Sequence, residues 1–207
     1  MKKGTRNSRE AILAAAMGLF AEKGYAATST REICAAAGIT KPVLYYHFRS
    51  KGHLYEELMI DSFSHFHKVW LRGPRARGTF RQRLTRVLYN DLKSARDEPV
   101  RVRFLTRMIF SPEERRPEFD AIEQMEQQRR ILVALFRDGI RNREVQGDPY
   151  QLATVLMGMN LITVLEHHFT GRPTLTLRNA ERLVNILLDG CVTNNPYTGR
   201  YNNHAQS

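Results

Sequence analysis

The sequence predicts an all-α protein with a small N-terminal domain and a larger C-terminal domain. Apolar residues recur at helical spacings of three and four positions along most of the chain, and no stretch shows the alternation of a half-buried strand. Pro, Gly and polar capping residues divide this pattern into segments of helical length. The 207 residues, 42% hydrophobic and 26% charged, are sufficient for a folded core without disulfides or metal ions.

Nine segments carry the helical pattern. They are residues 7–23, 30–37, 40–47, 51–71, 80–96, 100–110, 118–143, 149–169 and 177–192. The first is predicted to begin at Asn7, which forms a capping box with Glu10 three residues later, and to end at Gly24. Ser29 and Glu32 repeat the capping box at the start of the second segment.

A tight turn joins the second and third segments. The second has Ile33, Ala36 and Ala37 as its expected inward residues and ends at Gly38, and Thr40 then caps the third segment. Two short helices joined through a glycine have the spacing of a helix-turn-helix, whose second helix can enter the major groove of DNA. A purely structural helical hairpin is the alternative.

Capping and helix-breaking residues also bound the later segments. Ser50 caps the fourth, and Arg72-Gly-Pro-Arg marks a linker after it. Further breaks stand at Pro99, Pro112, Gly147, Gly171 and Pro173. The tail 194–207 is rich in Asn, has few apolar residues and is expected to be flexible. We therefore divide the chain into residues 1–52, 53–193 and 194–207.

The charge of the chain favours a polyanionic partner. The net charge is +11, which by itself does not choose between nucleic acid and a membrane surface. Residues 1–52 are the most basic part, with nine Lys and Arg against three Asp and Glu. Cys34 and Cys191 are too few for a disulfide framework. Glu10 interrupts the N-terminal apolar stretch, Glu22 and Lys23 follow it, and no long uncharged run exists, so we expect neither a secretion signal nor a membrane span. A reducing, cytoplasmic location is expected.

Hydrogen-bond donors crowd the third segment and its exit. They are Lys41, Tyr45, Tyr46, His47, Arg49 and Lys51. No acidic residue lies between Ile33 and Tyr55. Such a surface suits the phosphates of DNA and favours a nucleic-acid reader over a structural hairpin.

The order and spacing of these residues resemble the N-terminal signature of TetR-family transcriptional regulators, over about residues 7–60. The matching residues are Gly24-Tyr25, Thr28-Ser29, Ile33, Ala36 to Pro42, Leu44 to Phe48 and Ser50-Lys51. Gly52-His53 stands where the family often has an acidic residue. The rest of the chain resembles the family only in length and helicity.

The resemblance implies a helix-turn-helix DNA-binding domain over residues 1–52 and a helical ligand-binding and dimerisation domain over residues 53–193. It implies a homodimeric repressor that binds a palindromic double-stranded operator and is released by a small-molecule effector. An activator, or a repressor that requires a co-repressor ligand, stays open, because the fold does not set the sign of regulation.

An expected role in DNA contact can be assigned to each candidate residue. Ser29 and Thr30 stand at a helix N-terminus, where backbone donors attract phosphate. The candidates for base-edge contact are Thr40, Lys41 and Tyr46, and the residues matching family positions that contact the DNA backbone are Tyr45, His47 and Lys51. Four apolar residues of this region, Ile33, Ile39, Leu44 and Phe48, are expected in the core.

The segment 149–169 is apolar nearly all round and needs cover on more than one side. With the segment 177–192 it resembles the two helices that each family subunit contributes to an intersubunit four-helix bundle, so we expect a homodimer; a buried helix in a monomer is the alternative. The candidates for effector contact are Phe66, Trp70, Phe104, Met108, Met125, Phe136, Asn160, Thr163 and His167. Ordinary core packing would explain the same residues.

Other functional classes find less support. The sequence has no HExxH, GxSxG or phosphate-binding glycine loop, so we expect no enzyme, no catalytic residues and no cofactor. The residues His53, Glu57, Asp61 and His65 share a helix face but are spread over three turns, which favours a solvated face over a metal site. A membrane-surface or scaffold protein is a further alternative, prompted by Arg72, Arg75, Arg77, Arg81, Arg83 and Arg86.

Overall fold

The computed structural model describes residues 2–73, 77–110 and 116–190, with side chains from residue 8 onward. All regular structure in these ranges is α-helical, which confirms the predicted all-α class. The helices are α1 (Lys2–Lys23), α2 (Thr30–Ala37), α3 (Lys41–His47), α4 (Lys51–Arg72), α5 (Phe80–Asp97), α6 (Pro99–Phe110), α7 (Ala121–Arg141), α8 (Pro149–Thr170) and α9 (Leu177–Asp189). Among these helices, none combines the length and the apolar run that a membrane span would require.

Most predicted helix bounds agree with the structure, but two starts were wrong. Helix α1 begins at Lys2, so Asn7 lies inside the helix and does not cap it. The Lys and Arg residues of this stretch have good helix propensity, which allows the helix to extend upstream. Helix α7 begins at Ala121, later than predicted, because the Asp120 side chain accepts the N–H of Glu123 at 2.8 Å and caps the helix there.

Two further helix ends differ slightly from the sequence prediction. Pro99, predicted as a break, is the first residue of α6, a position where its missing N–H costs no intrahelical bond. Helix α9 stops at Asp189 because Gly190 has a φ of +76°, outside the range of a right-handed helix. Pro112, Cys191 and the predicted tail 194–207 lie outside the described residues.

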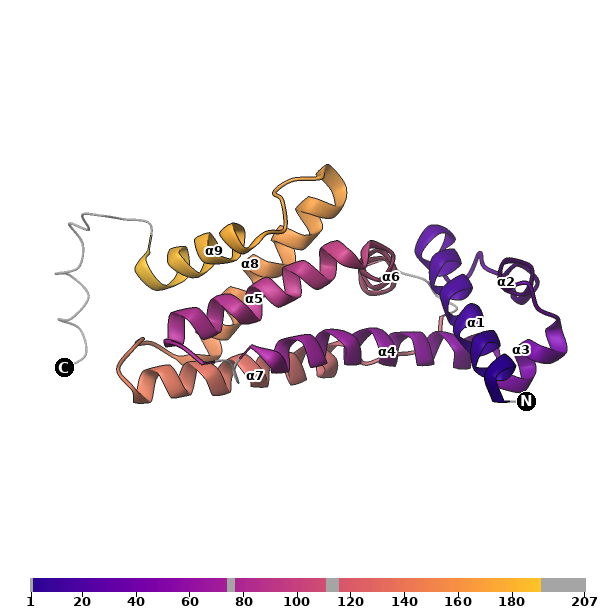
Figure 1. Ribbon diagram of the computed structural model, residues 1–207, viewed down its shortest axis with the longest axis horizontal. Helices are drawn as coiled ribbons and strands as arrows, with labels where there is room; N and C mark the ends of the chain where they lie inside the picture. The colour runs from indigo at the N-terminus through magenta and orange to yellow at the C-terminus, as the bar shows by residue number, and fades with distance from the viewer. Residues whose placement is uncertain (1, 74–76, 111–115, 191–207) are drawn as a thin grey trace, which may run out of the picture.

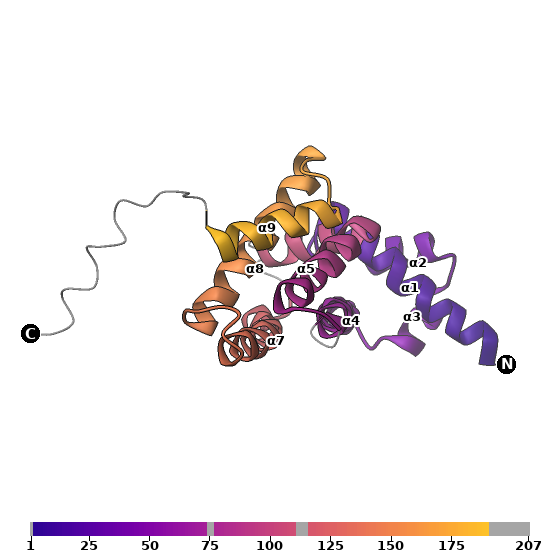
Figure 2. The ribbon, with the colours of Figure 1, turned by 60° about the vertical axis from the view of Figure 1, so that its left-hand side comes forward.

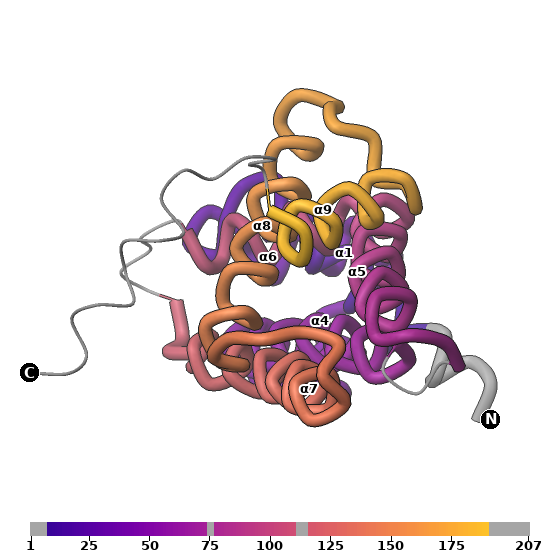
Figure 3. The backbone as a smooth tube through the Cα atoms, turned by 90° about the vertical axis from the view of Figure 1, so that its left-hand side faces the viewer, coloured from indigo at the N-terminus to yellow at the C-terminus, as the bar shows by residue number. Residues whose placement is uncertain are grey.

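Helices α1 to α3 form a unit at one end of the molecule, and α4 runs from this unit along the remaining helices (Figure 1). Helix α5 packs against both α4 and α9, and α7 packs along α8. The view turned by 60° again shows α9 beside α5, with α7 below them (Figure 2). Seen along the molecule, α4, α5, α8 and α7 are arranged around a common axis (Figure 3).

The core continues from the N-terminal helices into the C-terminal ones. Phe104 of α6 stacks on Phe20 of α1 with ring centroids 6.3 Å apart, and Tyr55 of α4 meets Phe104 at 6.4 Å. All three side chains are buried. The Arg107 side chain of α6 also donates to the backbone carbonyl of Glu22 in α1 at 3.1 Å. Helix α6 is thus a direct neighbour of the N-terminal unit.

Candidate DNA interface and effector cavity

The turn between α2 and α3 has the geometry of a helix-turn-helix. Gly38 adopts a φ of +64°, a left-handed conformation that favours glycine, and the Ile39 N–H returns to the Cys34 carbonyl at 3.0 Å. Ile33 is buried as predicted. Ala36, predicted to point inward, is exposed, because α2 turns Ile33 and Cys34 toward the core it shares with α1.

Helix α3 presents the side chains that the sequence singled out. Lys41 is exposed, and Tyr45 and Tyr46 keep 50% and 76% of their surface accessible. Leu44 is fully buried on the opposite face, as predicted. The Thr40 backbone caps the helix, but its side chain makes no capping hydrogen bond, so its hydroxyl is not used in holding the helix. Lys41, Tyr45 and Tyr46 together form one outward face of α3.

The N-terminus of α2 is closed by the predicted capping box. The Ser29 hydroxyl accepts the Glu32 N–H at 3.2 Å, and the Glu32 carboxylate accepts the Ser29 N–H at 2.8 Å. Glu32 also pairs with Lys23 at 2.7 Å, and this ammonium, with the Ser29 donors, lowers the pKa of Glu32 to about 2. Ser29 is exposed and Thr30 is half-buried beside it, so both stand at the helix end predicted to meet a phosphate.

Lys51 and His47 are more enclosed than the other DNA candidates. The Lys51 ammonium donates to the backbone carbonyls of Tyr25 and Thr28, both at 2.9 Å, and lies 4.1 Å from the centroid of the Tyr25 ring. This places Lys51 in the structure of the domain itself, a role that the sequence did not predict. His47 is half-buried, with its ring centroid 5.1 Å from that of Tyr46.

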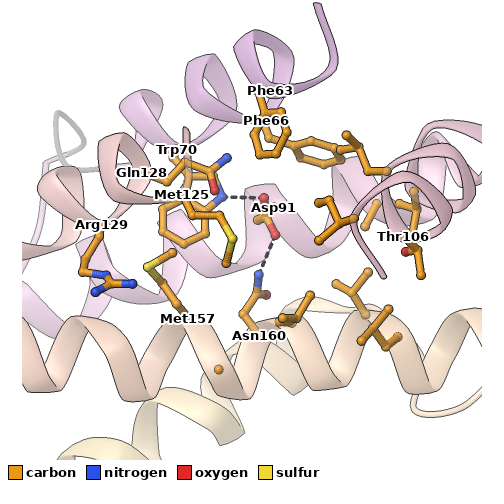
Figure 4. Close-up of a pocket in the computed structure, with 18 of the residues that line it drawn as sticks. Phe63, Phe66, Trp70, Asp91, Thr106, Met125, Gln128, Arg129, Met157 and Asn160 are labelled. Carbon is orange, nitrogen blue, oxygen red and sulfur yellow. Dashed lines mark hydrogen bonds between the residues drawn. The ribbon is translucent and has the colours of Figure 1, made fainter. Parts of the chain in front are cut away.

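A cavity of about 320 Å³ lies among the C-terminal helices (Figure 4). Its walls come from α4, α5, α6, α7 and α8, and apolar side chains dominate them. Phe66 and Trp70 of α4, Met125 of α7 and Asn160 of α8 line it, and all four were predicted effector contacts. The volume is at the lower end of the range for small-molecule sites, about 300 to 1,000 Å³.

Asp91 of α5 is the central polar group of the cavity wall. Its side chain is buried, the Trp70 indole N–H donates to one carboxylate oxygen, and the Asn160 amide donates to the other at 2.6 Å (Figure 4). Desolvation raises the pKa of Asp91, against the opposite effect of these two hydrogen bonds. The sequence analysis missed this residue, although its position three residues after Leu88 and four before Ala95 puts it on the buried face of α5.

The other predicted effector contacts lie outside this cavity. Phe104, Met108 and Phe136 are fully packed in the core. The Thr163 hydroxyl bonds to the Met159 carbonyl of its own helix at 2.7 Å, as Thr residues in helices often do. His167 lines a smaller neighbouring cavity of about 200 Å³. The helical period identified a polar stripe on α8, but only packing decided which member of the stripe faces the cavity.

The smaller cavity is basic. Arg96, Arg103, His167 and His168 contribute to its walls. Burial lowers the pKa of His168, and the neighbouring Arg103 and His167 lower it further. The His167 ring is 3.0 Å from the Pro173 carbonyl, and Arg96 is paired with Asp97, so two of these groups already have partners inside the protein.

Helices α8 and α9 leave apolar side chains uncovered. On α8, Val155, Ile162 and Phe169 are 50%, 61% and 73% exposed at spacings of seven residues, which places them on one face. Leu177 and Ile186 of α9 are 46% and 45% exposed. The prediction that the segment 149–169 lacks cover on one side within the monomer therefore agrees with the structure.

Several residues considered above for a metal site or for a membrane surface contact other residues of the protein. Along α4, His53 lies 3.5 Å from Glu57, whereas Asp61 pairs with Arg101 on α6. His65 is within hydrogen-bond distance of Ser94, at 2.8 Å. Of the arginines considered for a membrane surface, Arg81 pairs with Asp189 and Arg83 with Asp138.

Comparison with known proteins places the N-terminal part of the chain in a family. The profile of "Bacterial regulatory proteins, tetR family" matches residues 12–58, the segment that contains α2, the turn and α3. The N-terminal segment, residues 12–58, belongs to the TetR family. The chain is 29% identical over 147 residues to the HTH-type transcriptional repressor KstR2 of Mycolicibacterium smegmatis, a match that covers 68% of each chain.

Other similar proteins are also regulators. The chain is 35% identical over 86 residues to the HTH-type transcriptional regulator QacR of Staphylococcus aureus, a match that covers 42% of this chain and 45% of QacR. The fold is similar to that of the MbdR regulator from Azoarcus sp. CIB, with a TM-score of 0.73, 20% identity and coverage of 89% and 99%. It is also similar to FadR from Bacillus subtilis in complex with stearoyl-CoA, with a TM-score of 0.71, 18% identity and coverage of 88% and 99%. The predicted assignment to TetR-family transcriptional regulators is confirmed.

Proposed function

We propose that this protein is a homodimeric repressor that binds a palindromic operator through α2 and α3 and leaves it when a small molecule enters the cavity. The observation that carries the proposal is the pairing of an exposed α3 face with a separate cavity in the same continuous core. The predicted division at residue 52 into a DNA-binding and a regulatory part belongs to the proposal. Activation, or repression that requires a bound ligand, would use the same sites.

The DNA-binding roles follow from exposure. Lys41 and Tyr46 lie on the outer face of α3, where they can reach base edges in a major groove about 12 Å wide. Tyr45, at the same face, is suited to the phosphate backbone, as Ser29 is at the start of α2. We keep Thr30, Thr40, His47 and Lys51 as candidates, with the contribution of Lys51 divided between domain structure and phosphate contact.

The exposed apolar face of α8 and α9 is the proposed dimer interface. Ile162 and Phe169 are large apolar side chains left in water in the monomer, and a second copy of the face would bury them. A dimer is also what DNA recognition requires, because two α3 helices about 34 to 36 Å apart enter successive major grooves on one side of the duplex.

Helix α6 links the cavity to the DNA-binding helices. Leu105, Thr106 and Ile109 line the cavity, while Phe104 on the same helix stacks on Phe20 of α1. A ligand that displaces α6 would therefore shift α1 through this packed ring pair. Packed helices respond to such a shift as rigid bodies, so a small displacement changes the spacing of the two α3 helices.

Helix α4 provides a second connection. Phe63, Phe66 and Trp70, in the second half of α4, line the cavity. The first residue of α4, Lys51, follows shortly after the end of α3 at His47. Because α4 is one continuous helix between these points, rotation at the cavity end moves the end next to α3. Helix α4 is therefore proposed to act as a lever between the cavity and α3.

The experiment begins by selecting duplexes that the protein enriches from a random-sequence library. The selected duplex is then titrated by fluorescence anisotropy at several salt concentrations. We expect an inverted-repeat sequence, a stoichiometry of two chains or a multiple of two per duplex, and affinity that falls steeply with salt. Failure to enrich any sequence, or binding by a single chain to a site without symmetry, would contradict the proposal.

A further inference from the structure

The cavity holds an acid for which the described residues offer no cation. Asp91 is buried, and its two hydrogen-bond donors, the Trp70 indole and the Asn160 amide, are both neutral. Within the described residues, no basic side chain forms an ion pair with Asp91. An ionised carboxylate buried with neutral partners alone is costly, and burial accordingly raises the pKa of Asp91.

Asn160 contributes a second acceptor. Its amide nitrogen donates to Asp91, but its side-chain oxygen is buried and has no hydrogen-bond partner. A buried acceptor without a donor also costs free energy, and such groups are rare in folded proteins. The neighbouring Asp91 carboxylate has lone pairs beyond the two that accept the Trp70 and Asn160 donors. The wall of the cavity therefore lacks donors at this point and has acceptors in excess.

Among the described residues, Arg129 is the cationic side chain on the cavity wall; its terminal nitrogen Nη1 is engaged elsewhere, and its buried Nε has no hydrogen-bond partner. Its guanidinium donates to the Tyr150 hydroxyl, lies 4.7 Å from the centroid of the Tyr150 ring, and is 3.5 Å from Glu126. Figure 4 shows Arg129 on the far side of Met157 from Asp91. Its charge is therefore directed to the α7–α8 surface and does not neutralise Asp91.

The remaining wall suits the body of an organic cation. Phe63, Phe66 and Trp70 present aromatic rings on the α4 side, and aromatic faces attract cations in addition to covering apolar groups. We propose that the cavity binds an organic cation whose protonated amine donates to Asp91 and to the Asn160 side-chain oxygen, while its apolar body packs against these rings. This inference rests on the proposed function, since the cation would be the effector that releases DNA.

Isothermal titration calorimetry with the full-length protein tests the charge preference directly. The probes are phenylalkylamines from phenylethylamine to phenylhexylamine, each compared with the alcohol and the carboxylate of the same chain length. We expect at least one amine to bind about 10- to 100-fold more tightly than its alcohol, the range for a hydrogen-bonded charged group, and the carboxylates to bind most weakly. Equal or tighter binding of the alcohols or carboxylates, or the absence of binding by every amine, would overturn the proposal.

A pair of variants assigns the preference to Asp91. In D91N the new amide oxygen can accept the Trp70 N–H, and the new amide nitrogen can donate to the Asn160 oxygen once the Asn160 amide turns over, so the site keeps its shape without its charge. D97N removes a carboxylate from the exposed end of the same helix, where Asp97 pairs with Lys93. The amine preference should disappear in D91N and persist in D97N; retention in D91N would refute the assignment. If D91N does not fold, the amine-to-alcohol ratio of the wild type still decides the charge preference.

The two proposals fail in distinguishable ways. Calorimetry detects amine binding without DNA, and anisotropy detects duplex binding without an amine. A protein that binds its duplex but none of the amines refutes the cation site and leaves the DNA-binding proposal standing. A protein that prefers amines through Asp91, yet holds the duplex equally well with and without them, supports the cation site and refutes effector-driven release.

Discussion

Replacing Lys51 by methionine tests whether this residue acts in the structure of the DNA-binding domain. Methionine keeps most of the aliphatic stem and removes the ammonium, which donates to the carbonyls of Tyr25 and Thr28 at 2.9 Å each. Hydrogen bonds to a charged group contribute about 1.5 to 3 kcal/mol apiece, and the cation–π contact with Tyr25 adds about 0.5 to 1 kcal/mol. Lys51 is partly exposed, so water can replace part of these contacts.

The net loss expected for K51M is therefore about 2 to 3 kcal/mol of unfolding free energy. For a chain of this size this corresponds to a fall in Tm of about 4 to 12 °C, measured by far-ultraviolet circular dichroism. The matched control is K41M, which removes the same charge from an exposed position and should change stability by no more than about 0.5 kcal/mol. If K51M melts like the wild type while its duplex affinity and salt dependence both fall, the ammonium serves phosphate contact and the structural assignment is wrong.

Three further predictions concern the base contacts, the buried acid and the dimer. K41A should lose about 1 to 3 kcal/mol of affinity for the selected duplex and relax the preference at one base position, measured by competition with single-base variants; an unchanged preference would exclude Lys41 from base readout. D91N should be more stable than the wild type at neutral pH, because a raised folded-state pKa means that stability is lost as Asp91 ionises. The Tm difference should be absent below about pH 4, near the ordinary Asp pKa, and should grow as pH rises through the folded-state value; a more stable wild type at neutral pH would contradict the unpaired carboxylate. I162E should convert dimers into monomers in light scattering, while I60E, an exposed apolar position on α4, should not; a monomeric wild type at micromolar concentration would rule out the interface.

The local elements could be predicted from the sequence because their causes are local. The Ser29–Glu32 capping box, the left-handed turn at Gly38 and the buried Ile33 and Leu44 depend on residues a few positions apart. The error in the predicted start of α1 is also local in origin. Asn7 has the chemistry of a cap, but the residues before it also favour a helix. Signals of comparable strength at a helix end leave the boundary undecided.

The residues of the candidate site could be predicted only in part, and the reason is different. Periodicity identifies which residues share a helix face, but it does not say which neighbouring helix covers that face. Asn160 and Thr163 stand on the same stripe of α8, yet Asn160 reaches Asp91 in the cavity, whereas Thr163 bonds within its own helix. Phe104 was predicted to contact an effector and instead joins the cavity helix α6 to α1.

The sequence by itself determined the helices, the helix-turn-helix and the family, because these follow from short-range spacing and from capping, turn and donor residues. Only the tertiary structure decided that Lys51 turns its ammonium onto the carbonyls of Tyr25 and Thr28, and that Asp91 lies buried between Trp70 and Asn160. Both depend on contacts between residues 21 to 69 positions apart, with 23 and 26 for Lys51. Burial and hydrogen bonding at such separations are set by how whole helices pack, and no local pattern carries that information.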